Sequence, residues 1–212
     1  MRQWVLLRVQ RIPVLRVLAE TAEHLFAPSQ PVGVLGVIFN ADGHVLVAEH
    51  AARLADPWGL PGGWLNRREI PEHGILREID EELDMTVALD GYVGTHVHEY
   101  GRHQPRGLTL VFRLRSALGD RDTVASRTWE VVRTRWVSVD EACALALLDH
   151  DYSPRAFASC QGVDTRCAVA VLTHNYGPDA LHYCQGVDGA CAELVLQKNY
   201  APSAIPQSCR LR

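Results

Sequence analysis

Lysine is almost absent from this chain of 212 residues: Lys198 is the only lysine, and the other basic residues among the 21 are arginines. The 25 acidic residues outnumber the basic ones and give a formal net charge of −4 at pH 7. A chain of this charge has no overall positive field to attract a nucleic-acid backbone or an anionic membrane. We therefore expect no nucleic-acid partner.

Long hydrophobic runs are missing as well. The longest fall far short of the ~18 to 20 residues that span a bilayer. Arg8, Arg11 and Arg16 also interrupt the apolar stretch near the N-terminus, which argues against a signal peptide. The chain is 47% hydrophobic and 22% charged, as in ordinary globular proteins. We expect it in the cytoplasm, with no membrane partner.

Cysteine does not occur before Cys143, although six cysteines follow from there on. No Cys-x-x-Cys pair is present, and the spacings from Cys160 to Cys167 and from Cys184 to Cys191 match no common zinc pattern. Because no export signal accompanies these cysteines, we expect reduced thiols that are buried as small hydrophobic side chains. A structural zinc site is the alternative.

The first 30 residues predict an amphipathic helix followed by a linker. Apolar Trp4, Leu15 and Leu18 alternate with arginines, and Pro13 breaks or kinks the pattern. The polar face is only modestly basic, which favours a helix packed on the domain or on a partner subunit over one on a membrane surface. A homodimer is thus left open.

An α/β domain is predicted over residues 31–158. Apolar residues at 75, 76, 79 and 83 form one helical stripe, and residues 140–148 predict a second helix. The Gly- and Pro-rich residues 56–69 are predicted to form a loop. Strands alternating with helices are typical of layered α/β folds. The strands are expected at 32–39, 45–48, 87–97, 108–114 and 133–139.

Residues 159–212 form a C-terminal extension that repeats the end of the domain with a period of 24 residues. Each copy has a helical pattern, a Tyr-x-Pro break and a shorter helix, so the copies should stack as helix pairs on residues 140–160. The positions expected to be buried are Cys143, Cys167 and Cys191, with Leu148, Leu172 and Leu196. The extension would serve as an interaction surface or, alternatively, as a structural or poorly ordered addition without chemistry.

Acidic residues are concentrated between Glu69 and Asp84, where seven of the 25 acids lie. On the predicted helix, Glu78, Glu81 and Glu82 are spaced i, i+3 and i+4, so their carboxylates project from one face. Their mutual repulsion would be relieved by a hard divalent cation. Oxygen ligands without His or Cys favour Mg²⁺ or Mn²⁺ over zinc.

The whole string from Gly63 to Met85 resembles the Nudix box, Gly-x5-Glu-x7-Arg-Glu-U-x-Glu-Glu-x-Gly-U, where U is aliphatic. All spacings of the box are kept, and the lead-in from Trp58 to Gly62 is also similar to that of the family. The resemblance implies a Nudix-like α/β/α sandwich with a mixed sheet. Asp84 stands where the family has Gly, and we expect it to end the helix in a left-handed conformation without affecting metal binding.

The resemblance also implies roles for individual residues. Glu78, Glu81 and Glu82 would bind Mg²⁺, with Mn²⁺ as an alternative, and the Gly62 carbonyl would be an extra ligand. Arg77 would pair with Glu69 and hold the loop and the helix in register.

A general base is needed as well, and Glu130 is the candidate because its surroundings resemble the family segment that often supplies a further acid. An ordinary loop acid is the alternative at that position. Candidates for contact with substrate lie in the loop before residue 107, and ordinary surface or hydrogen-bonded structural groups are the alternative; they are His98, Glu99, Arg102, His103 and Arg106.

The implied reaction is the hydrolysis of a pyrophosphate bond by a metal-activated water. Its substrate would be a nucleotide-derived small molecule, either a nucleoside triphosphate or a nucleoside diphosphate linked to another moiety. The alternative is a non-catalytic Nudix fold that senses a nucleotide and uses the repeat extension as an interaction module. Loss of box carboxylates would favour this alternative, and none is lost.

Overall fold

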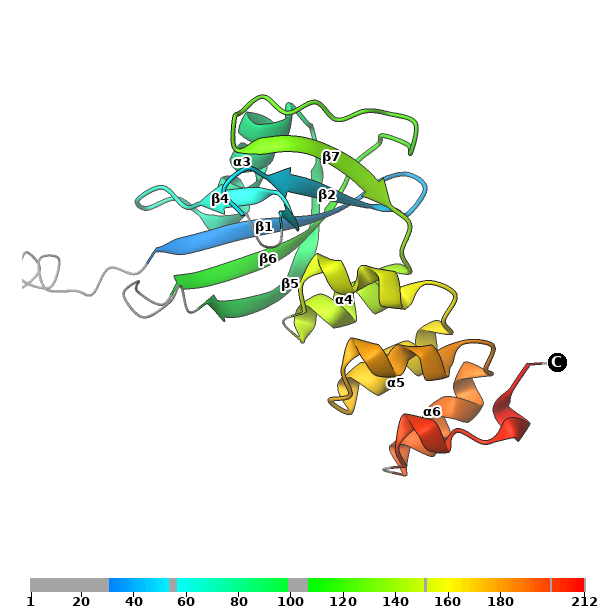
Figure 1. Cartoon of the computed structure of the whole chain (residues 1–212). Helices are drawn as coiled ribbons and strands as arrows, with labels where there is room; N and C mark the ends of the chain where they lie inside the picture. The colour runs from blue at the N-terminus through cyan, green and yellow to red at the C-terminus, as the bar shows by residue number, and fades with distance from the viewer. Residues whose placement is uncertain (1–30, 54–56, 99–106, 151, 199, 212) are drawn as a thin grey trace, which may run out of the picture. The chain divides into compact units, whose positions relative to one another are not determined.

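The computed structural model describes residues 31–53, 57–98, 107–150, 152–198 and 200–211. Residues 31–212 form one compact part of the chain (Figure 1). The predicted N-terminal helix lies outside the described residues. The domain boundaries expected from the sequence stay a prediction. None of the helices in the described ranges combines the length and the hydrophobicity needed to cross a membrane.

A mixed seven-stranded sheet lies at the centre of this part. Its order is β3-β2-β1-β6-β5, with β4 paired to β1 and β7 paired to β2. β1 and β6 are parallel, and the other pairs are antiparallel. The strands are β1 (Val32–Phe39), β2 (Val45–His50), β3 (Trp58–Gly59), β4 (Gly62–Trp64), β5 (Ala88–His98), β6 (Gly107–Arg115) and β7 (Val131–Val137).

Helices cover both faces of the sheet. On one face α3 (Pro71–Leu83) packs Ile75 and Ile79 against side chains of β1 such as Ile38. On the other face α4 (Glu141–Asp149) packs Leu147 in one cluster with Val37 of the same strand. Since alternate residues of β1 meet opposite helices, the strand is apolar throughout. The predicted α/β/α sandwich with a mixed sheet is confirmed.

The segment predicted as a loop over residues 56–69 contains the two shortest strands. β4 pairs with the first half of β1, in the register Val34 to Gly63 and Leu35 to Gly62. β3 pairs with the end of β2. Strands of two or three residues leave no periodic pattern in the sequence, because the neighbouring strands rather than local propensity hold them in place.

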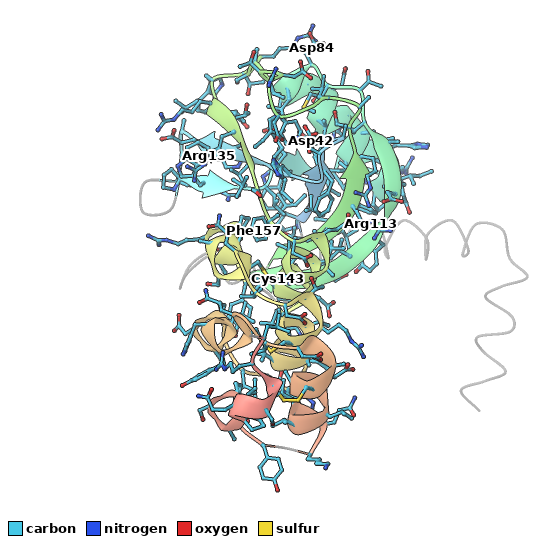
Figure 2. The ribbon with its side chains drawn as sticks, turned by 90° about the vertical axis from the view of Figure 1, so that its right-hand side faces the viewer. Asp42, Asp84, Arg113, Arg135, Cys143 and Phe157 are labelled. Carbon is cyan, nitrogen blue, oxygen red and sulfur yellow. A yellow bond between two sulfur atoms is a disulfide. The ribbon has the colours of Figure 1, made fainter. Side chains whose placement is uncertain are left out.

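The box helix ends as expected from the Asp-for-Gly replacement. Asp84 has φ 52° and ψ 38°, and its N–H donates to the carbonyl of Asp80 at 3.0 Å. Its side chain also forms an exposed ion pair with Arg127 at 2.8 Å. Asp84 lies on the side of the sheet away from the repeated extension (Figure 2). The left-handed helix end is therefore occupied by a residue with a Cβ, at some cost in free energy.

We expect Asp84→Gly to raise the free energy of unfolding by up to ~1 kcal/mol, because glycine adopts the left-handed conformation without strain. The exposed ion pair with Arg127 that is lost contributes little. Asp84→Ala is the matched control, since it removes the same ion pair but keeps the Cβ. Urea unfolding should rank the glycine variant above the alanine variant; the reverse order would contradict this explanation.

Three similar helical units follow the last strand. Each begins at an aspartate whose carboxylate caps the helix: Asp140, Asp164 and Asp188 accept the N–H groups of Cys143, Cys167 and Cys191 at 2.9, 3.0 and 2.9 Å. Each α-helix is followed by a 3₁₀ segment, which in the last unit is split in two. The units are α4 with η1 (Pro154–Cys160), α5 (Thr165–Thr173) with η2 (Pro178–Cys184), and α6 (Gly189–Gln197) with η3 (Pro202–Ala204) and η4 (Gln207–Cys209).

The expectation of reduced thiols is wrong. All six cysteines form disulfides, one within each repeat unit: Cys143–Cys160, Cys167–Cys184 and Cys191–Cys209. In each unit the chain reverses after the Tyr-x-Pro turn, which brings the Cα atoms of the two cysteines to 5.4–5.9 Å, within disulfide reach. Closing a loop of this length stabilises a fold by about 3 kcal/mol. The pairing also removes the thiolates that a zinc site would need.

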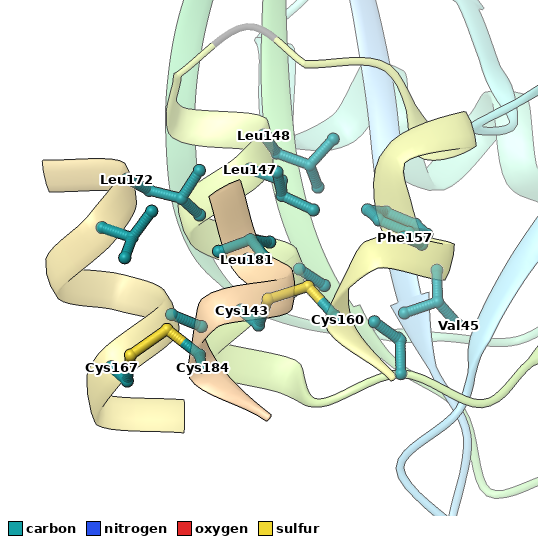
Figure 3. Close-up of a cluster of buried hydrophobic side chains, with 14 of the residues drawn as sticks. Val45, Cys143, Leu147, Leu148, Phe157, Cys160, Cys167, Leu172, Leu181 and Cys184 are labelled. Carbon is teal, nitrogen blue, oxygen red and sulfur yellow. A yellow bond between two sulfur atoms is a disulfide. The ribbon is translucent and has the colours of Figure 1, made fainter. Parts of the chain in front are cut away.

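The repeat units extend the core of the domain. A single apolar cluster runs from Val45 and Phe157 at the sheet to Leu181 in the second unit (Figure 3). It continues to Leu196 in the third unit. Polar contacts tie neighbouring units together: the Thr165 hydroxyl donates to Asp140 at 2.8 Å. The predicted stacking of helical units is confirmed, and so is the burial of the equivalent leucines. Among the equivalent cysteines, Cys143 and Cys167 are fully buried and Cys191 is partly exposed.

Candidate active site

The lead-in loop and the box helix meet at two glycines. The Gly62 N–H donates to Oε2 of Glu82 at 3.2 Å. Gly63 lies directly against the carboxylate of Glu78, where any Cβ would overlap that side chain. Gly62 has φ 140°, and a Cβ on it would overlap the carbonyl oxygen of Val34. Glycine is thus required at position 62, where the overlap is with the backbone of β1, whereas at position 63 it lets the loop lie against the acidic face of α3 without moving the Glu78 carboxylate.

Arg77 is the centre of an ion-pair network. Its guanidinium donates to both oxygens of Glu69, at 2.7 and 2.8 Å, and to the Trp64 carbonyl at 3.2 Å. These hydrogen bonds, with a further one from the Asn66 N–H, lower the pKa of Glu69 to about 2. The structure therefore brings Arg77 and Glu69 together across the loop and the helix.

The same guanidinium also reaches the box carboxylates. Nη1 of Arg77 lies 2.9 Å from Oε1 of Glu78 and 2.9 Å from Oε2 of Glu81. In this arrangement no three His, Cys, Asp or Glu side chains of the described ranges come close enough together to hold a metal ion. The Arg77 cation partly neutralises the negative charges of Glu78 and Glu81.

Glu82 is the most buried of the box carboxylates, with 5% of the residue exposed. Its pKa is raised to about 7, chiefly by burial and also by the negative charges of Glu78 and Glu130, against the opposing Gly62 hydrogen bond. Burial also raises the pKa of Glu78. A buried carboxylate among other acids is costly unless a cation compensates it. The oxygen-only donor set therefore fits a hard divalent cation.

Glu130 is close enough to this acidic group for its charge to raise the pKa of Glu82. The N–H of Arg127 donates to the carbonyl of Glu82 at 2.8 Å, which places the start of the turn before β7 at the end of α3. The Glu130 carbonyl accepts from the N–H of Ala51 at 2.8 Å, and its side chain is exposed. Among the other residues expected to contact substrate, 99–106 and the side chain of His98 lie outside the described residues.

A cavity of about 410 Å³ opens beside the glycine loop. Its floor comes from the sheet and one of its walls from the first repeat unit, whereas Gly62 and Gly63 close the end toward the glutamates. Most of its walls are apolar, as in small-molecule sites. The residues that line it are Gly33, Leu35, Arg53, Leu60, Gly62, Gly63, Trp64, His96, Thr109, Val111, Leu148, Tyr152, Ser153 and Pro154.

Several residues of this cavity were not singled out from the sequence as site residues. Arg53, His96 and Thr109 lie outside any motif, and only the fold brings them together. Tyr152 stands out as a repeat position, but Tyr176 occupies the same place in the next copy. The one available signal is that the first copy overlaps the end of the α/β domain, so that its turn, unlike the later ones, meets the sheet.

Comparison with known proteins agrees with this arrangement. The family model described as NUDIX domain matches residues 29–158. A MutT-like protein from Streptomyces ambofaciens is 33% identical over 127 residues, which cover 58% of this chain and 74% of that protein. An 8-oxo-dGTP diphosphatase from Proteus vulgaris is 32% identical over 81 residues, covering 37% of this chain and 70% of that protein.

Among solved structures, the MutT protein from Methanosarcina mazei Go1 aligns with a TM-score of 0.45 and 23% identity, covering 55% of this chain and 83% of that chain. The family is assigned from the match to the NUDIX domain model, which spans more than half of the 212 residues and includes the whole box from Gly63 to Met85. The chain therefore belongs to the NUDIX family.

Proposed function

We propose that this Nudix pyrophosphohydrolase is dependent on Mg²⁺, with Mn²⁺ as an alternative, and hydrolyses a nucleoside triphosphate or a nucleoside diphosphate linked to another moiety. The proposal rests on two glycines that lie between the cavity and the box carboxylates. Gly62 and Gly63 line the cavity on one side and contact Glu82 and Glu78 on the other. A nucleoside in the cavity would therefore have its phosphates beside the carboxylates.

Each group around the phosphates has a distinct task in this proposal. Glu78, Glu81 and Glu82 would hold the cation, with the Gly62 carbonyl as a further ligand. A bound cation would supply charge neutralisation on the phosphate oxygens and acidify a water. To free these carboxylates, Arg77 would give up its bonds to Glu78 and Glu81 and keep its bidentate contact with Glu69, which holds the helix against the loop.

Glu130 would act as the general base. Its exposed carboxylate accepts a proton from the attacking water. The water oxygen forms a new bond to phosphorus as the bridging P–O bond breaks, and the leaving phosphate oxygen keeps the electron pair. Arg53, which lines the cavity and whose charge opposes the raised pKa of Glu82, would pair with a phosphate oxygen.

The nucleoside would occupy the apolar end of the cavity. Tyr152 offers a ring for stacking, and Leu35 and Val111 offer apolar contact. The diphosphatase activity in the name of the Proteus relative makes an oxidised or normal purine nucleoside triphosphate the first candidate. All box carboxylates are present, and no observation favours the non-catalytic sensor.

The proposal also covers the partners of the protein and its location in the cell. We propose a nucleotide-derived small molecule as its ligand and neither nucleic acid nor membrane as a partner; a homodimer stays open. The cytoplasmic location expected from the sequence remains a prediction. The three disulfides count against it, because disulfides rarely persist in a reducing cytosol.

A substrate screen tests the proposal. With Mg²⁺ or Mn²⁺ we expect either release of pyrophosphate or phosphate from dGTP or 8-oxo-dGTP, or cleavage of ADP-ribose or UDP-glucose to a nucleoside monophosphate and a sugar phosphate, and no reaction after removal of metal with EDTA. Matched reactions with free nucleotide but no protein provide the background. Nucleotide binding without hydrolysis under all conditions would instead identify the sensor alternative.

A further inference from the structure

The first disulfide closes the segment that forms one wall of the cavity. Leu148, Tyr152 and Pro154 line the cavity, and all three lie between Cys143 and Cys160. The two cysteines are 0% and 2% exposed, and they belong to the same apolar cluster as Leu148 (Figure 3). The bond therefore lies within the packed core of the first unit, behind the wall it encloses.

Local hydrogen bonds shape the turn that forms this wall. Within the turn, the Tyr152 N–H donates to the Leu147 carbonyl at 2.9 Å, and the Ala156 N–H donates to the Ser153 carbonyl at 2.9 Å. Apolar packing is non-directional. The disulfide adds a covalent constraint on the position of the wall, because it fixes the start of α4 to the end of η1.

The three disulfides differ in how they relate to the cavity. The second unit supports the wall from behind: the Tyr152 hydroxyl lies 3.5 Å from the position that a Cβ on Gly177 would take. The third disulfide, Cys191–Cys209, encloses residues of which none lines the cavity. A change at the third disulfide should therefore leave the wall unaffected, whereas a change at the first should release it.

We propose that the Cys143–Cys160 disulfide is a positioning element of the substrate site, which holds Tyr152 and Leu148 at the distance where they contact the nucleoside. It acts through these side chains and does not take part in the reaction. The inference rests on the proposed function, because it assigns the nucleoside to this cavity. Loss of the bond should weaken nucleoside binding and leave the chemistry at the carboxylates unchanged.

A pair of matched variants tests this assignment. Cys143→Ala with Cys160→Ala should raise KM about tenfold and keep kcat within about twofold of the wild type, because only binding contacts are loosened. The control is Cys191→Ala with Cys209→Ala, which also removes one disulfide from one repeat unit and should change neither constant. The probes are dGTP, 8-oxo-dGTP and ADP-ribose. A KM that is unchanged in the first variant, or raised equally in both, overturns the proposal.

Amide hydrogen exchange provides a readout that does not depend on turnover. Exchange over residues 148–154 should be faster in the first variant and as in the wild type in the control; equal rates in all three proteins overturn the proposal. If the wild type hydrolyses none of the probes, the proposed function fails, and exchange still decides the role of the disulfide. Tyr152→Ala keeps the disulfide and should also raise KM, so an unchanged KM there counts against the proposal even if the cysteine variant does not fold.

Discussion

Replacement of Glu82 by Gln is expected to lower kcat at least ~100-fold while the protein remains folded. Gln has nearly the same shape and keeps an oxygen that accepts the N–H of Gly62, now 3.2 Å from the Glu82 carboxylate. It also removes a buried negative charge whose neighbours are acidic. The free energy of unfolding should therefore not fall, and a loss of turnover would report the loss of a metal ligand.

Asp80→Asn is the matched control for this prediction. Asp80 lies in the same helix between the box glutamates, and its side chain is exposed. The change removes one negative charge at nearly the same place in the sequence, so any general effect of charge would appear in both variants. Steady-state turnover and urea unfolding should be measured for both. Full metal-dependent turnover in a folded Glu82→Gln protein would contradict the assignment of the site.

Gly62→Ala is expected to cost about 3 kcal/mol or more of unfolding free energy, together with most of the activity. At φ 140° the added Cβ would overlap the Val34 carbonyl oxygen and lie 2.9 Å from the Cα of Leu35. Both neighbours are backbone atoms of β1, which cannot rotate away. The loop would move off β1 and take with it the N–H that contacts Glu82.

Gly43→Ala is the control that measures the cost of a positive φ alone, without an overlap between the added Cβ and neighbouring atoms. Gly43 also has a positive φ, 81°, but a Cβ there would meet nothing within 4 Å. We expect this variant to lose about 1 kcal/mol and no activity. Chemical denaturation and turnover of both variants provide the comparison. Equal losses of stability for the two variants would show that close approach to β1 is not what requires glycine at position 62.

The parts of the fold that follow a strong periodic pattern could be predicted from the sequence. The apolar run of β1 was located at its observed ends, and the box helix was identified by its stripe at Ile75 and Ile79. The left-handed conformation of Asp84 could be predicted because Asp84 stands where the Nudix box has a glycine at the end of the helix. In each case a local pattern determines the structure, so one sequence is enough to find it.

The rest depends on contacts between distant segments. The contact of Arg77 with Glu78 and Glu81, in addition to Glu69, is a matter of rotamers and distances that no spacing rule contains. The disulfides were missed because pairing depends on how each repeat unit turns back on itself. The absence of an export signal, used to predict reduced thiols, carries no information about that geometry. The wall at Tyr152 likewise arises only when the first unit packs on the sheet.

We propose that the box carboxylates form the metal site at which the nucleotide is hydrolysed. The most direct test is a Mn²⁺ titration in which the EPR signal of free Mn²⁺ and the turnover of the best nucleotide of the panel are followed in the same samples. We predict that binding and turnover rise together, that Glu82→Gln shifts both to higher Mn²⁺ concentration, and that Asp80→Asn shifts neither. Unchanged Mn²⁺ binding in Glu82→Gln, or turnover that persists in EDTA, would contradict the claim.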